Sequence, residues 1–472
     1  MQHFKINNMK SKIFKIAIFA IAVFEFSCSN FLEISPPKDK LISETVFKTD
    51  EIAISAMTGV YRSMAVNGYA SGDFSSINSV CGAAADELIG YEPIISEFYE
   101  NQISPSNAYI GSGLYATPFK TIYTTNAILE GLTSINGVTP PVKTQLMGEA
   151  YFVRAFVYFY LVNLYGNVPI QLTTDYRITQ NAQRKPVEAV YQQILTDLKT
   201  AEGLLTDSYV TTERIRPNKS AVQALLARVY LYLKDWENAE KYASLVIEKT
   251  GTYSLVDLDA IFLKNSNEAI WQLMPAANTN SKDGNLFILT TVPFYVSLKD
   301  AFVNNAFDPN DKRKLAWVRN FTNSTGTYYY PFKYKIRSST TVTEYSMVLR
   351  LAEQYLIRAE ARINQEKIEI GIQDLNALRT RARLSTAYST TSPLSLLSLT
   401  LSKTEALSAL ERERRVELFS EWGHRWLDLK RTNKANEILS LLKPKWQNTD
   451  ILFPIPTLEL TTNSAIKQNE GY

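Results

Sequence analysis

Histidine is almost absent from this chain, occurring only at His3 and His424 among 472 residues. His3 lies in an N-terminal segment with the features of a removable targeting sequence, so the remaining chain keeps one histidine. A multi-histidine metal site is therefore excluded, and a catalytic triad that depends on histidine is disfavoured. Carboxylate chemistry needs no histidine, so this scarcity leaves a glycosidase open.

Cysteine is equally scarce, with only Cys28 and Cys81 in the chain, so no disulfide framework is expected. The sequence also has no glycine-rich phosphate loop and no dinucleotide-binding fingerprint, which argues against a nucleotide cofactor. Fifty basic and 47 acidic residues leave a net charge of +3, spread evenly along the chain. This charge is too small to indicate a nucleic-acid-binding protein.

The N-terminal segment predicts export and a lipid anchor. Several lysines up to Lys15 precede the apolar run 16–24, which is the pattern of a secretory signal. The run is much shorter than the roughly 20 apolar residues that a membrane-spanning helix needs. The small residue Ser27 directly before Cys28 predicts cleavage there and lipidation of Cys28. We therefore expect residues 1–27 to be removed and the remaining protein to be anchored rather than membrane-spanning.

Two residues in this segment leave alternatives open. Glu25 stands where a bacterial lipobox usually has an apolar residue, so cleavage elsewhere, with Cys28 an ordinary residue, is the alternative. Met9 offers a second start that would give a more compact basic region.

Residues 219–249 have the pattern of two antiparallel helices. Apolar residues recur at helical spacing on both sides of an interruption before Trp236. The spacing of Leu226, Ala227, Tyr230 and Ala239 is that of a tetratricopeptide repeat, with the alanines where the helices approach closely. Asn218 is expected to cap the first of these helices.

Similar helical pairs occur elsewhere without forming a regular tandem array. One strongly apolar helix is expected to end at Gly166, and another begins near Val348 and turns at Asn364. A segment at about 251–345, rich in Gly, Pro, Asn, Ser, Thr and aromatic residues, interrupts the series. The sequence thus predicts a mostly α fold of tetratricopeptide-like hairpins with long irregular insertions. Binding sites are expected on those insertions.

A set of short motifs is spread over the whole chain. The motifs are Phe31–Pro36 after Cys28, Gly59–Tyr61, Asn126–Leu129, Gly148–Ala155, Leu164–Pro169, Glu411–Leu418, Gly423–Arg431, Phe453–Pro456 and Gln468–Tyr472. Each motif is weak alone, but their order along the chain is specific, and it resembles the SusD/RagB family of Bacteroidetes outer-membrane lipoproteins. The sequence departs from the family pattern at Glu25 and at Leu114, where many relatives carry tryptophan.

The resemblance implies a single SusD-like domain over residues 28–472, with an N-terminal part (28–250), an insertion-rich segment (251–345) and a C-terminal part (346–472). It also implies a non-catalytic protein, without cofactor or metal, at the cell outer membrane and exposed on the surface. Such a protein captures oligosaccharides or other nutrients for a SusC-like TonB-dependent transporter. Capture of peptides or glycoproteins, and a helical-repeat scaffold that binds only protein partners, are the alternatives.

Aromatic residues make up 12% of the chain, including 27 tyrosines, and several lie in two loop-rich stretches. Sugars stack their C–H faces on aromatic rings, while carboxylates, amides and arginines bind their hydroxyls. The alternative is that these rings only pack the loops onto the scaffold. The candidate ligand-binding residues are Asp86, Tyr91, Tyr99, Tyr109, Tyr115, Tyr295 and Trp317.

Other conspicuous residues are expected to be structural. The charged stretch Arg412–Glu417 has spacings that favour ion pairs along one exposed helix. His424 is expected to be packed, Arg154 to reach a buried carboxylate or carbonyl groups, and Tyr158 and Tyr160 to lie in the core.

A glycosidase would need two carboxylates, and Asp86 and Glu87 are the obvious pair. Adjacent side chains diverge in both strands and helices, so this pair is a poor acid/base couple.

Overall fold

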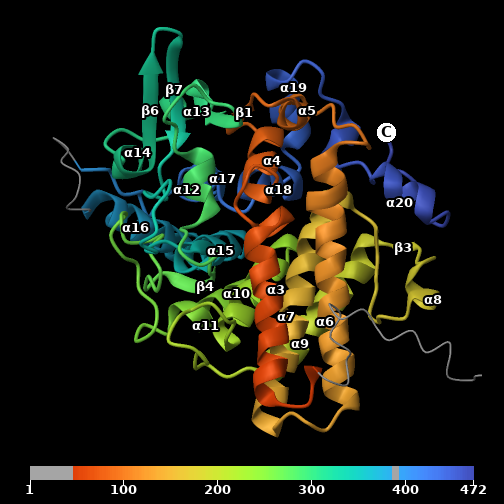
Figure 1. The fold of residues 1–472 in the computed structure, drawn as a ribbon. Helices are drawn as coiled ribbons and strands as arrows, with labels where there is room; N and C mark the ends of the chain where they lie inside the picture. The colour runs from red at the N-terminus through yellow and green to blue at the C-terminus, as the bar shows by residue number, and fades with distance from the viewer. Residues whose placement is uncertain (1–45, 385–392) are drawn as a thin grey trace, which may run out of the picture. The chain divides into compact units, whose positions relative to one another are not determined.

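The structure is a computed structural model that describes residues 46–384 and 393–472. It is 55% helical, which confirms the predicted mostly α fold. The elements from α3 onward belong to one compact unit, Phe47–Tyr472 (Figure 1). The predicted anchor residue Cys28 lies outside the described residues.

Four long helices, α3 (Asp50–Val66), α6 (Thr117–Ser134), α7 (Pro140–Tyr165) and α9 (Val187–Leu204), lie side by side in Figure 1. The most apolar of them, α7, ends where the sequence predicts. Gly166 follows it with a φ of 70°, a left-handed conformation that glycine adopts without a steric penalty.

The predicted tetratricopeptide-like hairpin consists of α10 (Lys219–Tyr232) and α11 (Trp236–Ile247). Asn218 caps α10 as expected, because its side-chain oxygen accepts a hydrogen bond from the Ala221 N–H at 3.0 Å. Ala227 and Ala239 are completely buried where the two helices pack. The hairpin and its cap are therefore confirmed.

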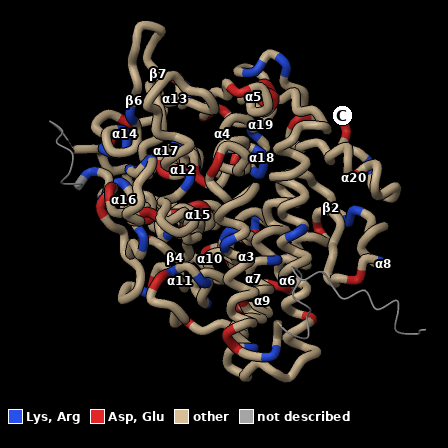
Figure 2. Tube along the Cα trace, in the orientation of Figure 1, with Lys and Arg blue, Asp and Glu red and all other residues tan. Residues whose placement is uncertain are grey.

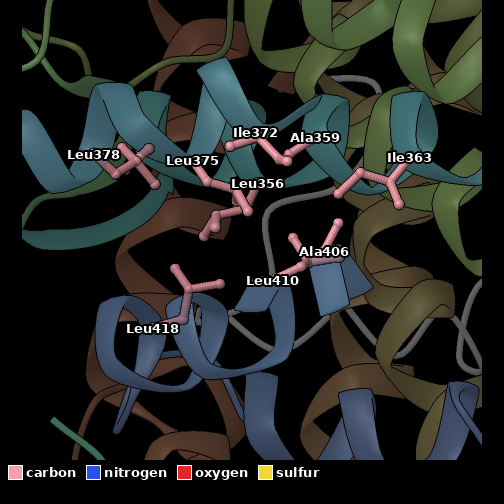
Figure 3. Close-up of a cluster of buried hydrophobic side chains, with 10 residues drawn as sticks. Leu356, Ala359, Ile363, Ile372, Leu375, Leu378, Ala406, Leu410 and Leu418 are labelled. Carbon is pink, nitrogen blue, oxygen red and sulfur yellow. The ribbon is translucent and has the colours of Figure 1, made fainter. Parts of the chain in front are cut away.

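A second hairpin, α15 (Leu351–Asn364) and α16 (Ile368–Leu384), packs against α11 and against α17 (Lys403–Leu418). Leu356, Ile372 and Leu410 meet in the hydrophobic cluster between these helices (Figure 3). Burying each such side chain stabilises the fold by about 1.5–3 kcal/mol.

The segment that interrupts the helices is more regular than its composition indicates. It contains strand β4 (Ala269–Leu273), which pairs antiparallel with β8 (Ser346–Arg350). The helix expected from Val348 therefore begins only at Leu351. Every residue of both strands is buried, and the short apolar run within each, 269–271 and 347–349, suits a strand as well as a buried helix.

A four-stranded sheet has the order β1-β5-β7-β6 and joins distant parts of the chain. Strand β1 (Leu88–Gly90) pairs with β5 (Val296–Leu298), which also pairs with β7 (Gly326–Pro331). Strands β6 (Val318–Asn323) and β7 form a hairpin that extends away from the helices (Figure 1). The pairing of β1 with β5 brings the loops around residues 90 and 295 together.

Shorter elements complete the described residues. They are η1 (Gly68–Ala70), α4 (Ile77–Ala84), α5 (Pro93–Glu100), η2 (Tyr109–Ala116), β2 (Val168–Pro169), α8 (Tyr176–Thr179), β3 (Arg184–Lys185), α12 (Lys282–Phe287), α13 (Asp300–Asn305), α14 (Lys312–Trp317), α18 (His424–Arg431), α19 (Ala435–Leu442), η3 (Asn448–Ile451) and α20 (Thr457–Thr462).

The prediction for the charged stretch Arg412–Glu417 is wrong. Glu413 and Glu417 are buried, and they pair with arginines of other elements instead of along α17. Arg313 Nη1 lies 2.6 Å from Glu413 Oε1 and 2.9 Å from Glu417 Oε2. Figure 2 shows basic and acidic segments interleaved around α15, α16 and α17. A spacing of three or four residues also aligns side chains on an inward face, which the exposed-helix interpretation overlooked.

Glu417 is the centre of this buried set of charges. Arg350 Nη1 lies 2.7 Å and Arg381 Nη2 2.5 Å from its Oε1 atom. Burial opposes ionisation of Glu417, but Arg381, Arg350 and Arg313 outweigh it and hold its pKa well below the usual value. We call this set the Glu417 network, which comprises Glu268, Arg313, Arg350, Arg381, Glu413, Glu417 and Glu421.

The remaining structural expectations are confirmed. Arg154 forms two hydrogen bonds with the buried carboxylate of Asp197, at 2.8 and 2.6 Å. Tyr158, Tyr160 and His424 are all buried. Asn126, within one of the family-like motifs, accepts a further hydrogen bond from Arg154 at 2.8 Å.

Candidate functional site

Four aromatic rings, from the loop before α4, the start of η2 and the loop before β5, form a continuous row. The ring centroids of Tyr109 and Phe74 are 5.6 Å apart, those of Phe74 and Tyr295 are 4.7 Å apart, and those of Tyr295 and Phe294 are 4.8 Å apart. Phe74 and Tyr295 are stacked, with 10° between their planes. We call these four residues the ring row.

Backbone hydrogen bonds fix the ring row to the scaffold. The Tyr91 N–H donates to the Tyr295 carbonyl at 2.9 Å, which extends the pairing of β1 with β5. The Asn107 side chain accepts a hydrogen bond from the Tyr109 N–H at 2.9 Å and donates to Glu97 at 2.8 Å. The backbones of Tyr295 and Tyr109 are therefore held in position before any ligand arrives.

The ring row remains accessible to ligands. Phe294 is 67% exposed, and the other three rings are half-buried. The Tyr109 hydroxyl donates to Glu92 at 3.4 Å, and burial together with the Glu92 charge raises the pKa of Tyr109. Tyr109 is therefore neutral over the physiological range. Flat, neutral rings of this kind can stack against the apolar face of a ligand.

A pocket of roughly 590 Å³ lies beside the ring row, and Phe74 and Tyr295 form part of its wall. This volume is within the usual range for sites that bind small molecules. Most of the remaining wall is polar, and we call this cavity the Tyr295 pocket. Six of its polar lining residues are Asp73, Asn278, Asn285, Arg337, Ser338 and Thr340.

The charges within the Tyr295 pocket are partly neutralised by one another. Lys282 Nζ donates to the Val66 carbonyl at 2.5 Å and lies 3.3 Å from Asp73 Oδ2. Asp73 also accepts hydrogen bonds from the N–H and the hydroxyl of Ser75. Amides, hydroxyls and an arginine around two stacked rings can bind the hydroxyl groups of a polar ligand while the rings contact its apolar face.

A second pocket of roughly 510 Å³ adjoins the first, because Pro275, Ala276 and Asn278 line both. Its wall is more apolar and includes Met274 and Tyr345. Two adjoining pockets along one loop could hold successive units of an elongated ligand.

Two of the predicted site residues, Tyr109 and Tyr295, are brought together by the structure in the ring row. Tyr91 is 39% exposed, and its hydroxyl lies 2.9 Å from the Ser297 hydroxyl, but it lines neither pocket. Tyr99 is half-buried, with the Lys299 ammonium 4.8 Å from its ring centroid. Tyr91 and Tyr99 therefore lie outside both pockets.

Trp317 and Tyr115 are buried in the scaffold instead of lying on a ligand-binding surface, where the sequence predicts them. Trp317 is completely buried, and its indole N–H donates to the Leu258 carbonyl at 3.2 Å. Tyr115 is buried against Phe119 and Tyr165. Neither ring has a free face for a ligand, because packing of the loops onto the scaffold covers both.

Asp86 is a buried ion-pair partner rather than a ligand contact. Its carboxylate accepts hydrogen bonds from Arg425 at 2.7 and 2.9 Å and from Arg415 at 2.8 Å. Burial would raise the pKa of Asp86, but the two arginines outweigh burial and lower it to about 2. Asp86 thus stabilises the packing of α17 and α18 against the segment before β1.

Glu87 completes the carboxylate pair that a glycosidase would use, and it too is buried. Its side chain accepts a hydrogen bond from the Ser420 N–H at 3.2 Å. Burial raises the pKa of Glu87 to about 7. Neither Asp86 nor Glu87 lines the Tyr295 pocket, so this pair is not placed to act on a ligand bound there.

The prediction of candidate residues missed Phe74 and the polar loop 337–340. Phe74 is a single aromatic residue within the polar stretch SGDFSS, which is a feature that a search for ring-bearing loops could have used. Loop 337–340 contains no aromatic residue, so that search would have passed over it.

Within residues 46–384 and 393–472, no group of three or more His, Cys, Asp or Glu side chains is arranged to hold a metal ion. The same residues include no helix that is both long and apolar enough to cross a membrane.

The described residues thus form a scaffold of helical hairpins that presents an aromatic and polar pocket on its inserted loops, an arrangement typical of a binding protein. Comparison with known families agrees. A family model described as "Starch-binding associating with outer membrane" matches residues 30–231, and one described as "SusD family" matches residues 299–472. The chain belongs to the SusD/RagB family, which confirms the predicted membership.

Individual relatives match over nearly the whole chain. SusD-like protein P2 of Formosa agariphila is 25% identical over 98% of this chain and 100% of its own length. A SusD-like protein of Bacteroides ovatus is 26% identical over 89% of this chain and 82% of its own length.

Solved structures share the fold. A SusD superfamily protein from Bacteroides vulgatus has a TM-score of 0.76 and 21% identity, over 91% of this chain and 100% of that one. A laminarin-binding SusD-like protein has a TM-score of 0.74 and 22% identity, over 90% of this chain and 100% of that one.

Proposed function

We propose that this protein is a non-catalytic binding protein that captures oligosaccharides. The observation that carries the proposal is the stack of Phe74 and Tyr295 in the wall of a pocket whose other lining residues are mostly polar, including amides, hydroxyls, an arginine and the ion pair of Lys282 with Asp73. The rings would contact the C–H faces of a sugar, and the polar side chains would bind its hydroxyl groups. Membership of the SusD/RagB family and the likeness to a laminarin-binding SusD-like protein support this function.

The proposed cellular setting is the outer membrane. The protein would be anchored by a lipid on Cys28, exposed at the surface, and would pass its ligand to a SusC-like TonB-dependent transporter. The description "associating with outer membrane" of the family model that matches residues 30–231 supports this setting. Binding at the transporter would raise the local ligand concentration, and the energy for uptake would come from the transporter.

Isothermal titration calorimetry against a glycan panel and a peptide digest tests the function. The protein would begin at Ser29, which retains the compact unit Phe47–Tyr472. We expect an oligosaccharide to bind, and Tyr295→Ala to weaken that binding about tenfold to a hundredfold through the loss of a central ring. The control is Tyr123→Ala, which removes a 54% exposed tyrosine of α6 that lines neither pocket.

Three results would contradict the proposal. Release of shortened products on long incubation would indicate catalysis, and binding only to peptides would indicate a different nutrient. Equal loss of glycan affinity in Tyr295→Ala and Tyr123→Ala would mean that the ring row is not the binding site.

A further inference from the structure

Arg337 differs from the other charged residues of the Tyr295 pocket. Its side chain is exposed and lines the pocket. Among the described residues, its guanidinium has no ion-pair or hydrogen-bond partner. Lys282 and Asp73 lie 3.3 Å apart and partly neutralise each other, so Arg337 is the one charged residue of this wall without a charged partner among the described residues.

The loop that carries Arg337 is held in place by the buried carboxylate of Glu344. Its oxygens accept hydrogen bonds from the N–H groups of Lys335 at 2.6 Å and Ile336 at 3.0 Å. These bonds fix the backbone directly before Arg337.

The buried side chain of Asn280 holds the other end of the same loop. It donates to the carbonyls of Ser339 at 3.3 Å and Thr341 at 2.9 Å, and it accepts from the N–H groups of Thr343 and Glu344. The four residues 337–340 are therefore presented to the pocket from a braced backbone. Such bracing lowers the entropy cost of binding a ligand there.

A nearby buried carboxylate does not supply the missing partner. Asp283 is not part of the pocket wall, and its oxygens accept hydrogen bonds from Asn78 at 2.5 Å and Ser281 at 2.6 Å. The charge of Arg337 is thus free to meet a group brought by the ligand.

We propose that the Tyr295 pocket takes acidic oligosaccharides, whose carboxylate or sulfate group pairs with Arg337 while a sugar ring lies against Tyr295 and Phe74. This inference rests on the proposed function and specifies its ligand class. A guanidinium binds two oxygens of a carboxylate or sulfate through a planar pair of N–H donors, which favours arginine over lysine in this position. The pocket combines that donor with the rings and amides that a neutral sugar would need.

Matched pairs of acidic and neutral oligosaccharides test the inference by calorimetry. One pair is an oligogalacturonide and its methyl ester, and the other is a sulfated galactan oligosaccharide and its desulfated form. We expect the acidic member of at least one pair to bind the protein, beginning at Ser29, about tenfold more tightly than its neutral counterpart. The pair that shows the preference identifies the acidic group. Raising the salt concentration should lower the affinity for the acidic ligand more than the affinity for its neutral counterpart.

Substitution of Arg337 locates the preference. Arg337→Gln should abolish the preference, so that the acidic and neutral members of a pair bind with affinities within about twofold of each other. Arg337→Lys should retain part of the preference. Arg412→Gln, which removes an exposed arginine of α17, is the control and should leave the preference intact.

The outcomes separate this inference from the proposed function. Equal affinity for both members of both pairs, or a preference that survives Arg337→Gln, would overturn the acidic-ligand inference and leave glycan capture standing. Absence of binding to every oligosaccharide would overturn both.

Discussion

The Glu417 network and the Tyr295 pocket contain the same kinds of residue in opposite situations. In the network, Arg313 is completely buried and touches three carboxylates, whereas Arg337 in the pocket is exposed and has none among the described residues. The aromatic rings beside the two regions differ in the same way. Trp317, whose ring centroid lies 5.7 Å from the Arg381 guanidinium of the network, is completely buried, whereas Phe294 of the ring row beside the pocket is 67% exposed. Residue type therefore does not distinguish the scaffold from the site. What distinguishes them is whether a side chain is buried with its partners or exposed without them.

This difference implies that stability and ligand affinity can be changed separately. Substitutions in the network should unfold the protein without changing the affinity of molecules that remain folded. Substitutions of side chains in the pocket wall, such as Tyr295→Ala and Arg337→Gln, should lower ligand affinity with little effect on stability.

The largest expected effect is that of Glu417→Gln. The substitution keeps the shape of the side chain but leaves Arg313, Arg350 and Arg381 short of one negative charge in the interior. Breaking a buried ion pair from one side typically costs about 3–5 kcal/mol, so the free energy of unfolding should fall by that amount. Urea unfolding followed by circular dichroism measures it.

The control for Glu417→Gln is Arg412→Ala on the same helix. Arg412 is exposed, so its removal should change the free energy of unfolding by no more than about 0.5 kcal/mol. If both variants lose a similar free energy of unfolding, the ion pairs of Glu417 do not contribute more to stability than an exposed residue of α17 does. Unchanged glycan affinity in folded Glu417→Gln would support the separation of the two regions.

A pH effect of about 3 kcal/mol is expected from buried His424. Burial lowers its pKa from 6.5 to about 4, although the Glu353 charge opposes this change. Arg228 and Arg414 lower the pKa further, and Asp428 raises it. Between pH 6.5 and 4 the unfolded chain binds a proton that the folded protein does not. The contribution of neutral His424 is therefore complete above pH 6.5 and is lost as the pH falls to 4.

His424→Gln should remove this dependence, so the difference in unfolding free energy between variant and wild type should change by about 3 kcal/mol over that interval. Glu87→Gln provides the opposite case. Burial raises the pKa of Glu87 from 4.5 to about 7, so its contribution is complete below pH 4.5 and is lost as the pH rises to 7. Parallel pH profiles for the two variants would contradict the assignment of both groups.

Much of the scaffold could be predicted from the sequence because its determinants are local. Asn218 caps α10 and Gly166 ends α7 through contacts within a few residues, and helical periodicity marks the hairpins. The strand β8 was misassigned because a short apolar run suits a strand and a helix equally.

The candidate site was less predictable because its parts are distant in the chain. Phe74 and Tyr295 are far apart in the sequence yet stack on each other, and no local pattern encodes that contact. Trp317 is a residue type that often contacts sugars, yet its ring is enclosed because it packs against Phe262 and Phe419. Long-range pairing and burial decide which aromatic residues face a ligand, and neither is visible in the residue type.

The smallest expected change in stability is that of Asn280→Ala. This substitution tests how the two regions are connected, because Asn280 is buried like the residues of the network but supports a loop of the pocket. Asn280→Ala leaves N–H and carbonyl groups of loop 339–344, most of them partly buried, without the Asn280 side chain as a partner. Each unsatisfied group costs about 1–3 kcal/mol, although water can reach part of this loop, so we expect a loss of about 1–3 kcal/mol in total. Thermal unfolding measures this loss.

Asn280→Ala should also weaken ligand binding about tenfold, because the backbone that presents Arg337 loses its support. The matched control is Asn285→Ala, which removes an exposed amide of the same pocket and should affect affinity without affecting stability. If Asn280→Ala lowers stability but leaves affinity for both acidic and neutral oligosaccharides unchanged, loop 337–340 takes no part in binding. Loss of both stability and ligand affinity in Asn280→Ala would instead show that the rigidity of the scaffold extends into the pocket. The buried amide of Asn280 would then determine how the exposed Arg337 contacts its ligand.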